Sequence, residues 1–221
     1  MITTLTSLTP LVSRIRSNSL SADDRKALVD GIRLLDDESK VIAAMVRGIL
    51  NSMSKTNAWT SMLRIVREVR EFIDPQAAFS KTRLSVDVDP LVAHLEFPDT
   101  PVRQSLFNVV LNALQHLQSC DMKRAKEISV VIEESNQSDF DVSIRVSDNG
   151  FGVHFNERER VFDPYFTTRK EGTGFGLYLT RAMIESLGGL VRIKESVRFS
   201  GTTFEIELKK LNKKDWQRKV V

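Results

Sequence analysis

Two asparagines and a histidine lie four residues apart, at Asn108, Asn112 and His116, in a stretch otherwise rich in leucine, valine and phenylalanine. On a helix this spacing places all three side chains on one face, with Gln115 beside them. Asparagine is unfavourable inside a helix because its amide competes for backbone hydrogen bonds. Its amide oxygen is a neutral hard ligand that suits Mg²⁺. The face therefore predicts either a magnesium site or a set of satisfied amides, and by itself the spacing favours the amides.

A carboxylate and five glycines form two further segments. Asp148 precedes Gly150 and Gly152, and by itself this stretch is a turn. A carboxylate at a strand end also accepts hydrogen bonds from an amine, and glycines let a ligand approach the backbone. Residues 172–177 (Gly-Thr-Gly-Phe-Gly-Leu) precede an expected helix, whose free N–H groups and dipole suit a phosphate. They form neither a Walker loop nor a dinucleotide fingerprint. Residues 201–204 predict only a turn and a strand.

Hydrophobic periodicity predicts the elements that must position these residues. Residues 150–175 are rich in glycine, threonine and charge and are more typical of a lid than of a packed element. A Gly-Gly pair at 188–189 marks the end of the helix that follows the lid. We expect a helix at about 101–118, strands at 128–133 and 142–147, a helix at 176–187, and closing strands at 190–193 and 203–208.

The segment before the asparagines is also expected to mix helix and strand. An apolar pattern that starts at Trp59 and includes Met62 and Ile73 predicts a helix that ends before Pro75. Alternating Leu84, Val86 and Val88 predict a strand, with 92–97 as its hairpin partner.

Residues 1–55 predict a helical hairpin. Ser21 is a plausible N-cap for its second helix, which carries an apolar heptad seam from Leu28 to Met53 with one polar position, Ser39. The first helix is too short to cover that seam, so a dimeric four-helix bundle through 21–54 is favoured. The alternative is an ordinary bundle edge with no role beyond assembly.

Composition excludes several classes of protein. Of the 221 residues, 41% are hydrophobic and 28% charged, as in a globular chain. The single cysteine, Cys120, permits no internal disulfide and fits a reducing compartment. The longest apolar run is far shorter than the roughly 20 residues that span a bilayer, and the start shows no signal-peptide pattern, so any membrane sensor would lie elsewhere. Residues 209–221 carry six basic side chains and one acid, which leaves −2 of the net +3 for the rest. The basic balance is a tail effect, and we expect no nucleic-acid partner.

The order of these motifs resembles the ATP-binding catalytic domain of sensor histidine kinases in two-component systems, the GHKL type of ATPase, and especially its nitrogen-regulator-like subgroup. The resemblance covers roughly residues 57–209. It implies an α+β protein in which the helical hairpin precedes a Bergerat ATP-binding fold, an α/β sandwich with a mixed sheet and helices on one face. The matching boxes are the asparagine box at 108–116, the first glycine box at 148–152, the phenylalanine box at 161–170 and the second glycine box at 172–177.

The resemblance also implies roles for single residues. Asp148 would accept the adenine amino group, with Thr202 supporting it through water. Asn112, assisted by Asn108, would hold Mg²⁺ against the triphosphate, and Arg169 or Lys170 on the lid would reach the terminal phosphate. Phe162 and Phe166 would anchor the lid. The implied ATP-binding set comprises Asn108, Asn112, Gln115, His116, Asp148, Gly150, Gly152, Thr168, Gly172, Thr173, Gly174, Phe175, Gly176, Leu177 and Thr202, with Asn108, Arg169 and Lys170 in catalytic roles.

Two departures from the family pattern stand out. Gln115 occupies a position where many members have lysine or arginine, which removes one cation from the phosphates. The family's acceptor histidine lies on the first bundle helix, usually five residues before a proline, and Pro10 places that position at Leu5. Truncation, replacement and loss of autokinase chemistry each account for its absence.

Two functions therefore compete. The leading one is the cytoplasmic core of a sensor histidine kinase, with residues 1–55 for dimerisation, 56–209 for ATP binding and 210–221 as a basic tail. It would pass phosphate from ATP to a histidine and then to the aspartate of a response regulator. The alternative is a non-catalytic signalling scaffold that binds nucleotide and a response regulator.

Overall fold

The computed structural model describes residues 58–169 and 172–211, together with Ser21, Asp23, Arg25, Lys26, Val29 and Asp30. The chain divides into two compact units, Met1–Leu50 and Asn51–Val221. In the first unit the N–H of Arg25 donates to the carbonyl of Ser21 at 3.1 Å, and the chain is helical at Asp23 and beyond, where described. The remainder of the predicted hairpin, its heptad seam and its dimer lie outside the described residues.

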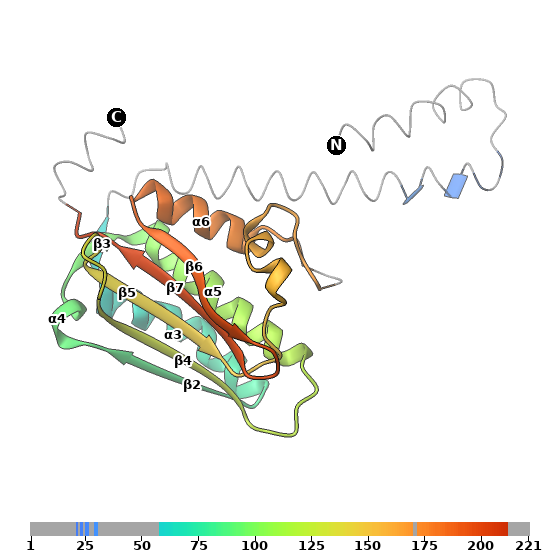
Figure 1. Ribbon diagram of the computed structural model, residues 1–221, viewed down its shortest axis with the longest axis horizontal. Coiled ribbons are helices and arrows are strands. Elements are labelled where there is room, and N and C mark those ends of the chain that lie inside the picture. Colours follow the sequence, from blue (N-terminus) through green and yellow to red (C-terminus); the bar gives the residue numbers. More distant parts are fainter. Residues whose placement is uncertain are drawn as a thin grey trace. The chain divides into compact units, whose positions relative to one another are not determined.

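The second unit carries short strands, helices and two 3-10 turns in a mixed order (Figure 1). These elements are β1 (Trp59–Ser61), α3 (Met62–Phe79), β2 (Thr82–Val88), α4 (Pro90–Ala93), β3 (Glu96–Pro98), α5 (Asp99–Ser119), β4 (Lys126–Glu134), β5 (Val142–Asp148), η1 (Phe155–Glu157), η2 (Arg160–Phe162), α6 (Gly176–Ser186), β6 (Leu190–Val197) and β7 (Gly201–Leu208).

Five strands form one mixed sheet in the order β2-β4-β5-β7-β6. The pair β2–β4 is parallel, and the other three pairs are antiparallel. The helix α3 contacts β2, α5 contacts β4 and β5, and α6 contacts β6, so the three long helices cover one face of the sheet (Figure 1). The predicted α/β sandwich with a mixed sheet and helices on one face is confirmed.

The core lies between this sheet face and the helices. Alternate positions of β4 and β5 are buried, as expected for strands with one covered face. The buried apolar residues of α5 face β4 and β5, whereas Asn108 and Asn112 on the same helix are only half-buried. The largest fully buried side chains come from both the helices and the strands and include Met62, Ile65, Phe97, Leu106, Leu114, Ile132, Ile144, Ile184 and Ile206.

Two boundaries predicted for the first helix are wrong. Trp59 belongs to β1, and the helix begins at Met62 after Ser61, whose hydroxyl accepts from the N–H of Arg64 at 3.4 Å. The helix also continues through Pro75 to Phe79. A proline inside a helix costs about 3 kcal/mol. Ile73 and Ala77, which are 0% and 3% exposed, pack in the core on either side of it, and their burial offsets this local cost.

The predicted hairpin between 84–88 and 92–97 is also wrong. Pro90 opens the short helix α4, which Asp89 caps by accepting from the N–H of Leu91 at 2.8 Å. The strand β3 then pairs with β1, whereas β2 pairs in parallel with β4. A parallel partner requires a long crossover, and α4, β3 and α5 together provide it.

Among the described residues, no helix combines the length and apolar character that crossing a membrane requires.

Two phenylalanines provide a matched test of this core. Phe97 is 0% exposed, whereas Phe79 at the end of α3 is 90% exposed. We expect Phe97→Ala to lower the free energy of unfolding by about 3–5 kcal/mol because it leaves a cavity, and Phe79→Ala to change it by less than about 0.5 kcal/mol. Urea unfolding followed by circular dichroism measures both values. Equal losses for the two variants would contradict the assignment of the core.

Candidate functional site

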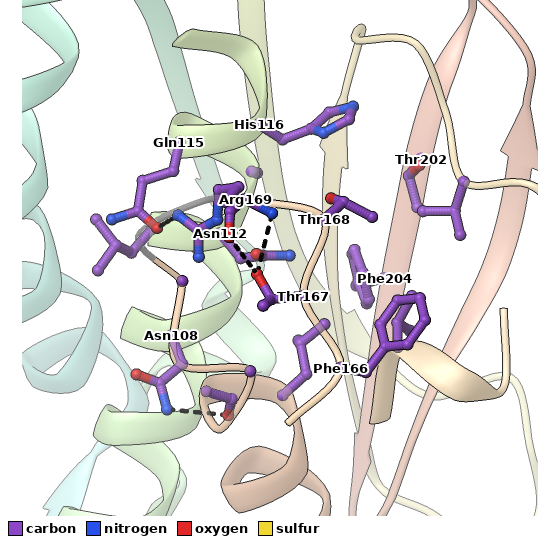
Figure 2. Close-up of a pocket in the computed structure, with 18 of the residues that line it drawn as sticks. Asn108, Asn112, Gln115, His116, Phe166, Thr167, Thr168, Arg169, Thr202 and Phe204 are labelled. Carbon is purple, nitrogen blue, oxygen red and sulfur yellow. Dashed lines mark hydrogen bonds between the residues drawn. The ribbon is translucent and has the colours of Figure 1, made fainter. Parts of the chain in front are cut away.

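A cavity of about 380 Å³ opens between α5, the segment after β5, the loop before α6 and the start of β7 (Figure 2). It brings together most of the residues that the sequence analysis singled out. Gly150 and Phe175 are not among its lining residues, and Lys170 lies outside the described residues. The predicted residues that line it are Asn108, Asn112, Gln115, His116, Asp148, Gly152, Thr168, Arg169, Gly172, Thr173, Gly174, Gly176, Leu177 and Thr202.

Asp148 is the buried carboxylate of this cavity. It is the last residue of β5 and only 8% exposed, and its Oδ1 accepts from the N–H of Gly150 at 2.8 Å. Burial raises the pKa of Asp148 above its ordinary value, although the N–H of Gly150, His116 and the N–H of Thr202 act in the opposite direction. A buried carboxylate of this kind is suited to accept a hydrogen bond from a ligand N–H.

Two glycines permit the backbone to pack tightly around Asp148. A Cβ on Gly150 would lie 2.8 Å from Cδ2 of His116 and 2.9 Å from Oδ1 of Asp148. Gly201 has φ of +120°, and a Cβ there would lie 1.8 Å from the carbonyl oxygen of Asp148. Both positions therefore require glycine, the first for space and the second also for conformation.

Ser196 on β6 supports this end of the cavity, and sequence reasoning missed it. Its hydroxyl accepts from the N–H of Val153 at 2.7 Å and lies 3.0 Å from the hydroxyl of Thr202. Thr202 is itself opposite Asp148 in the β5–β7 register. Ser196 therefore ties the segment after β5 to the strand that carries Thr202. A serine in a strand with no recognisable motif gives no signal in a single sequence.

His116 faces the same end. Its Nε2 is buried and has no hydrogen-bond partner among the described residues. The ring lines the cavity (Figure 2), and it also lies against Gly150. An unpartnered buried nitrogen costs free energy unless a ligand or water satisfies it, and it is here an available polar contact on the cavity wall.

The two asparagines of α5 differ in what they contact. The amide of Asn108 donates to the carbonyl of Gly176 at 3.3 Å (Figure 2), and it also lies 3.5 Å from the hydroxyl of Thr180. Asn108 therefore ties α5 to the first turn of α6. The side chain of Asn112 lines the cavity without a hydrogen bond to any other described residue. Asn112 is thus the amide that is available to a ligand or metal.

No group of three or more His, Cys, Asp or Glu side chains within the described ranges could hold a metal ion. A single amide oxygen does not bind Mg²⁺ by itself, because Mg²⁺ keeps several waters and relies on substrate phosphates. Any Mg²⁺ at Asn112 would therefore arrive with a phosphate-bearing ligand.

Gln115 and Arg169 meet across the cavity. The guanidinium of Arg169, on the loop before α6, donates to Oε1 of Gln115 on α5 (Figure 2). The turn that carries Arg169 is itself fixed, since its N–H donates to the hydroxyl of Thr167 at 3.1 Å. The hydrogen bond to Gln115 thus holds the positive charge of Arg169 at the side of the cavity formed by α5.

The glycine-rich loop ends at the first turn of α6, which has no side-chain cap. Free N–H groups and the helix dipole at such a terminus favour an anion. Gly174 has φ of +69°, and a Cβ there would lie 2.4 Å from the carbonyl carbon of Tyr165. Phe175, 3% exposed, packs edge-on against Tyr165 with ring centroids 4.6 Å apart. The buried ring of Phe175 thus fixes the glycine-rich loop against Tyr165.

The two phenylalanines of the phenylalanine box differ in position, and their predicted role as lid anchors stays a prediction. Phe162 is 2% exposed and packs edge-on against Phe204 at 6.2 Å, whereas Phe166 lines the cavity itself (Figure 2). Several other lining residues had no predicted binding role, because isolated apolar, hydroxyl and acidic side chains carry no distinctive signal in a single sequence. These residues include Leu111, Val153, Glu157, Val161 and Thr167.

Comparisons with known proteins agree with this geometry. Residues 99–212, slightly more than half of the chain, match the family described as histidine kinase-, DNA gyrase B-, and HSP90-like ATPase. The signal transduction histidine-protein kinase AtoS of Escherichia coli K12 is 25% identical over 206 residues, which cover 92% of this chain and 32% of AtoS. The sensor histidine kinase ZraS of Salmonella typhimurium is 30% identical over 144 residues, which cover 65% of this chain and 29% of ZraS.

A solved catalytic domain of the histidine kinase ThkA superposes with a TM-score of 0.58 at 25% identity, covering 69% of this chain and 95% of that domain. The chain spans about a third of the length of the two curated relatives. The chain belongs to the family of histidine kinase-, DNA gyrase B- and HSP90-like ATPases, and its resemblance to the sensor histidine kinases within that family is confirmed.

Proposed function

We propose that this chain binds Mg²⁺-ATP in the cavity and serves as the ATP-binding core of a two-component sensor histidine kinase. One observation carries the proposal. A single cavity combines the buried carboxylate of Asp148, the uncapped start of α6 and the available amide of Asn112. These groups suit, respectively, an amino-bearing base, a phosphate chain and a divalent cation.

The residues present fit such a ligand. The unpartnered Nε2 of His116 and the raised pKa of Asp148 mark polar groups whose desolvation costs free energy in the absence of a ligand. Asp148 would accept the adenine amino group, and Thr202 would support it. The N–H groups of 172–177 would bind phosphate oxygens, and Arg169 would neutralise charge at the terminal phosphate, with Lys170 as the neighbouring cation. Asn112 on α5 would hold Mg²⁺, whereas Asn108 would fix the position of α6 relative to α5 through its hydrogen bond to Gly176.

ATP would supply the phosphoryl group, and a histidine imidazole would accept it. The protein's own contribution would be positioning and charge neutralisation, as in phosphoryl transfer generally. The proposed organisation keeps residues 1–55 for dimerisation, 56–209 for ATP binding and 210–221 as a basic tail. A cytoplasmic location and a response regulator as the partner belong to the same proposal.

The alternative is a non-catalytic scaffold in which the bound nucleotide only sets the geometry of the dimer. It is motivated by Leu5, an alkyl side chain at the position where the family resemblance expects the acceptor histidine. Both functions use the same nucleotide pocket. They differ in whether the terminal phosphoryl group of ATP is transferred to a histidine.

Restoring an imidazole at that position separates the two functions. We expect Leu5→His, incubated with γ-labelled Mg²⁺-ATP, to acquire an acid-labile label, because an imidazole nucleophile replaces an alkyl group that cannot attack phosphorus. Leu11→His, off the expected position, is the control and should remain unlabelled. If Leu5→His binds ATP yet stays unlabelled, the scaffold is the better description.

Asp148→Asn tests the base end of the pocket. We expect ATP affinity to fall about 10- to 100-fold, since the variant loses a hydrogen bond to a charged acceptor. Asp121→Asn, the same change at an exposed position, should leave the affinity unchanged. Isothermal titration calorimetry with and without Mg²⁺ measures both. Unaltered binding by Asp148→Asn would remove Asp148 from the site.

The same variant has a pH-dependent signature in stability. Because burial raises the folded-state pKa of Asp148 above its unfolded value, the folded chain binds more protons than the unfolded chain between those two values. Ionisation of Asp148 therefore lowers stability as the pH rises through this window. We expect the free energy of unfolding of Asp148→Asn, relative to wild type, to increase from about pH 4 to about pH 7. Urea unfolding at both pH values measures it, and a constant difference would contradict the buried ionised carboxylate.

Asn112→Ala tests the metal end. We expect the gain in ATP affinity that Mg²⁺ confers to shrink by about tenfold, because an amide beside the metal is lost. Affinity measured in EDTA should change little. Gln118→Ala, an exposed amide on the same helix, is the matched control. An undiminished Mg²⁺ effect in Asn112→Ala would assign the metal to other groups.

A further inference from the structure

Arg124 connects two loops at the base end of the cavity, and no sequence motif contains it. It lies in the connection between α5 and β4. Its Nη2 donates to three backbone carbonyls: to Asn149 at 2.5 Å, to Phe199 at 2.7 Å and, at longer range, to Gly150 at 3.3 Å. Hydrogen bonds from a charged donor are among the stronger ones in proteins.

One of these contacts leads directly to Asp148. The carbonyl of Asn149 and the N–H of Gly150 belong to the same peptide unit, which is planar, so the two groups point in opposite directions. Arg124 binds the carbonyl side, and the N–H side donates to Oδ1 of Asp148 at 2.8 Å. The guanidinium therefore fixes and polarises the peptide that orients the carboxylate.

The remaining contacts hold the surrounding turns. Asn149 is tied to the start of β4, because its amide donates to the carbonyl of Ala125 at 2.8 Å and accepts from the N–H of Glu127 at 2.9 Å. Phe199, in the turn between β6 and β7, donates its N–H to the carbonyl of Phe151 at 2.9 Å. Phe199 has φ of +63°, a strained conformation for a bulky residue that persists only where its surroundings enforce it. Arg124 contacts this residue through the carbonyl of Phe199.

We propose that Arg124 is a positioning residue for recognition of the nucleotide base. It acts through the Asn149–Gly150 peptide on the carboxylate of Asp148, and through Phe199 on the turn that leads to Thr202. The ligand class is a purine nucleotide with an exocyclic amino group. The inference rests on the proposed function, since it requires that Asp148 accepts that amino group.

The test compares ATP with purine riboside triphosphate, which lacks the 6-amino group. We expect wild type to bind ATP about tenfold or more tightly than this analogue. Arg124→Met should lose most of that preference, because Asp148 is no longer held in one orientation, while its affinity for the analogue stays close to that of the control. Lys123→Met is the control, since it removes the same charge from the same exposed loop. Arg124→Lys should restore part of the preference.

The outcomes separate a positioning role from a merely structural one. Equal weakening of both nucleotides by Arg124→Met would overturn the inference, as would an unchanged preference in Arg124→Met and Arg124→Lys. In the Asp148→Ala background, Arg124→Met should cause no further loss of preference, and a further loss would also overturn it. If wild type binds ATP without preferring it, this inference alone fails. If wild type binds neither nucleotide, the proposed function fails first.

Discussion

The buried carboxylate of Asp148 is the constraint on which the rest of the site depends. A carboxylate that is 8% exposed carries a desolvation cost, which raises its pKa. The surrounding structure offsets only part of that cost with the N–H of Gly150, and it brings the backbone at Gly201 so close that no side chain fits there. Burying this carboxylate therefore costs stability, and in the proposed function a hydrogen bond from the ligand would offset that cost.

The cavity has one end built on regular structure and another built on loops. At the base end, Asp148 and Thr202 lie opposite each other on paired strands, and Arg124 and Ser196 tie the adjoining turns to them. At the other end, Phe175 of the glycine-rich loop packs against Tyr165, and the N–H of Gly172 donates to the carbonyl of Arg169 at 3.2 Å. Recognition of a base requires a fixed acceptor, whereas phosphates are bound by backbone N–H groups that a loop can bring together.

Much of this arrangement could be predicted from the sequence, because the strands alternate and the four motifs lie in order. The features that were predicted wrongly or missed share one physical cause, which is their dependence on contacts between distant parts of the chain. Whether the helix ends at Pro75 depends on core contacts of Ile73 and Ala77, and the partner of 84–88 is a strand about forty residues further along the chain. Arg124 and Ser196 act on backbone groups distant in sequence. Local sequence propensity cannot predict such contacts, since they form only when the chain has folded.

Gln115 illustrates how a contact changes the meaning of a sequence departure. By itself, glutamine in place of lysine or arginine removes a cation from the phosphates. The Oε1 of Gln115, however, accepts a hydrogen bond from Arg169, which a lysine or arginine at 115 could not do. A neutral acceptor leaves the charge of Arg169 intact, whereas a carboxylate would neutralise it and a second cation would repel it. In the proposed site, Arg169 on the loop would therefore supply the positive charge that α5 lacks, and its hydrogen bond to Gln115 would hold it there.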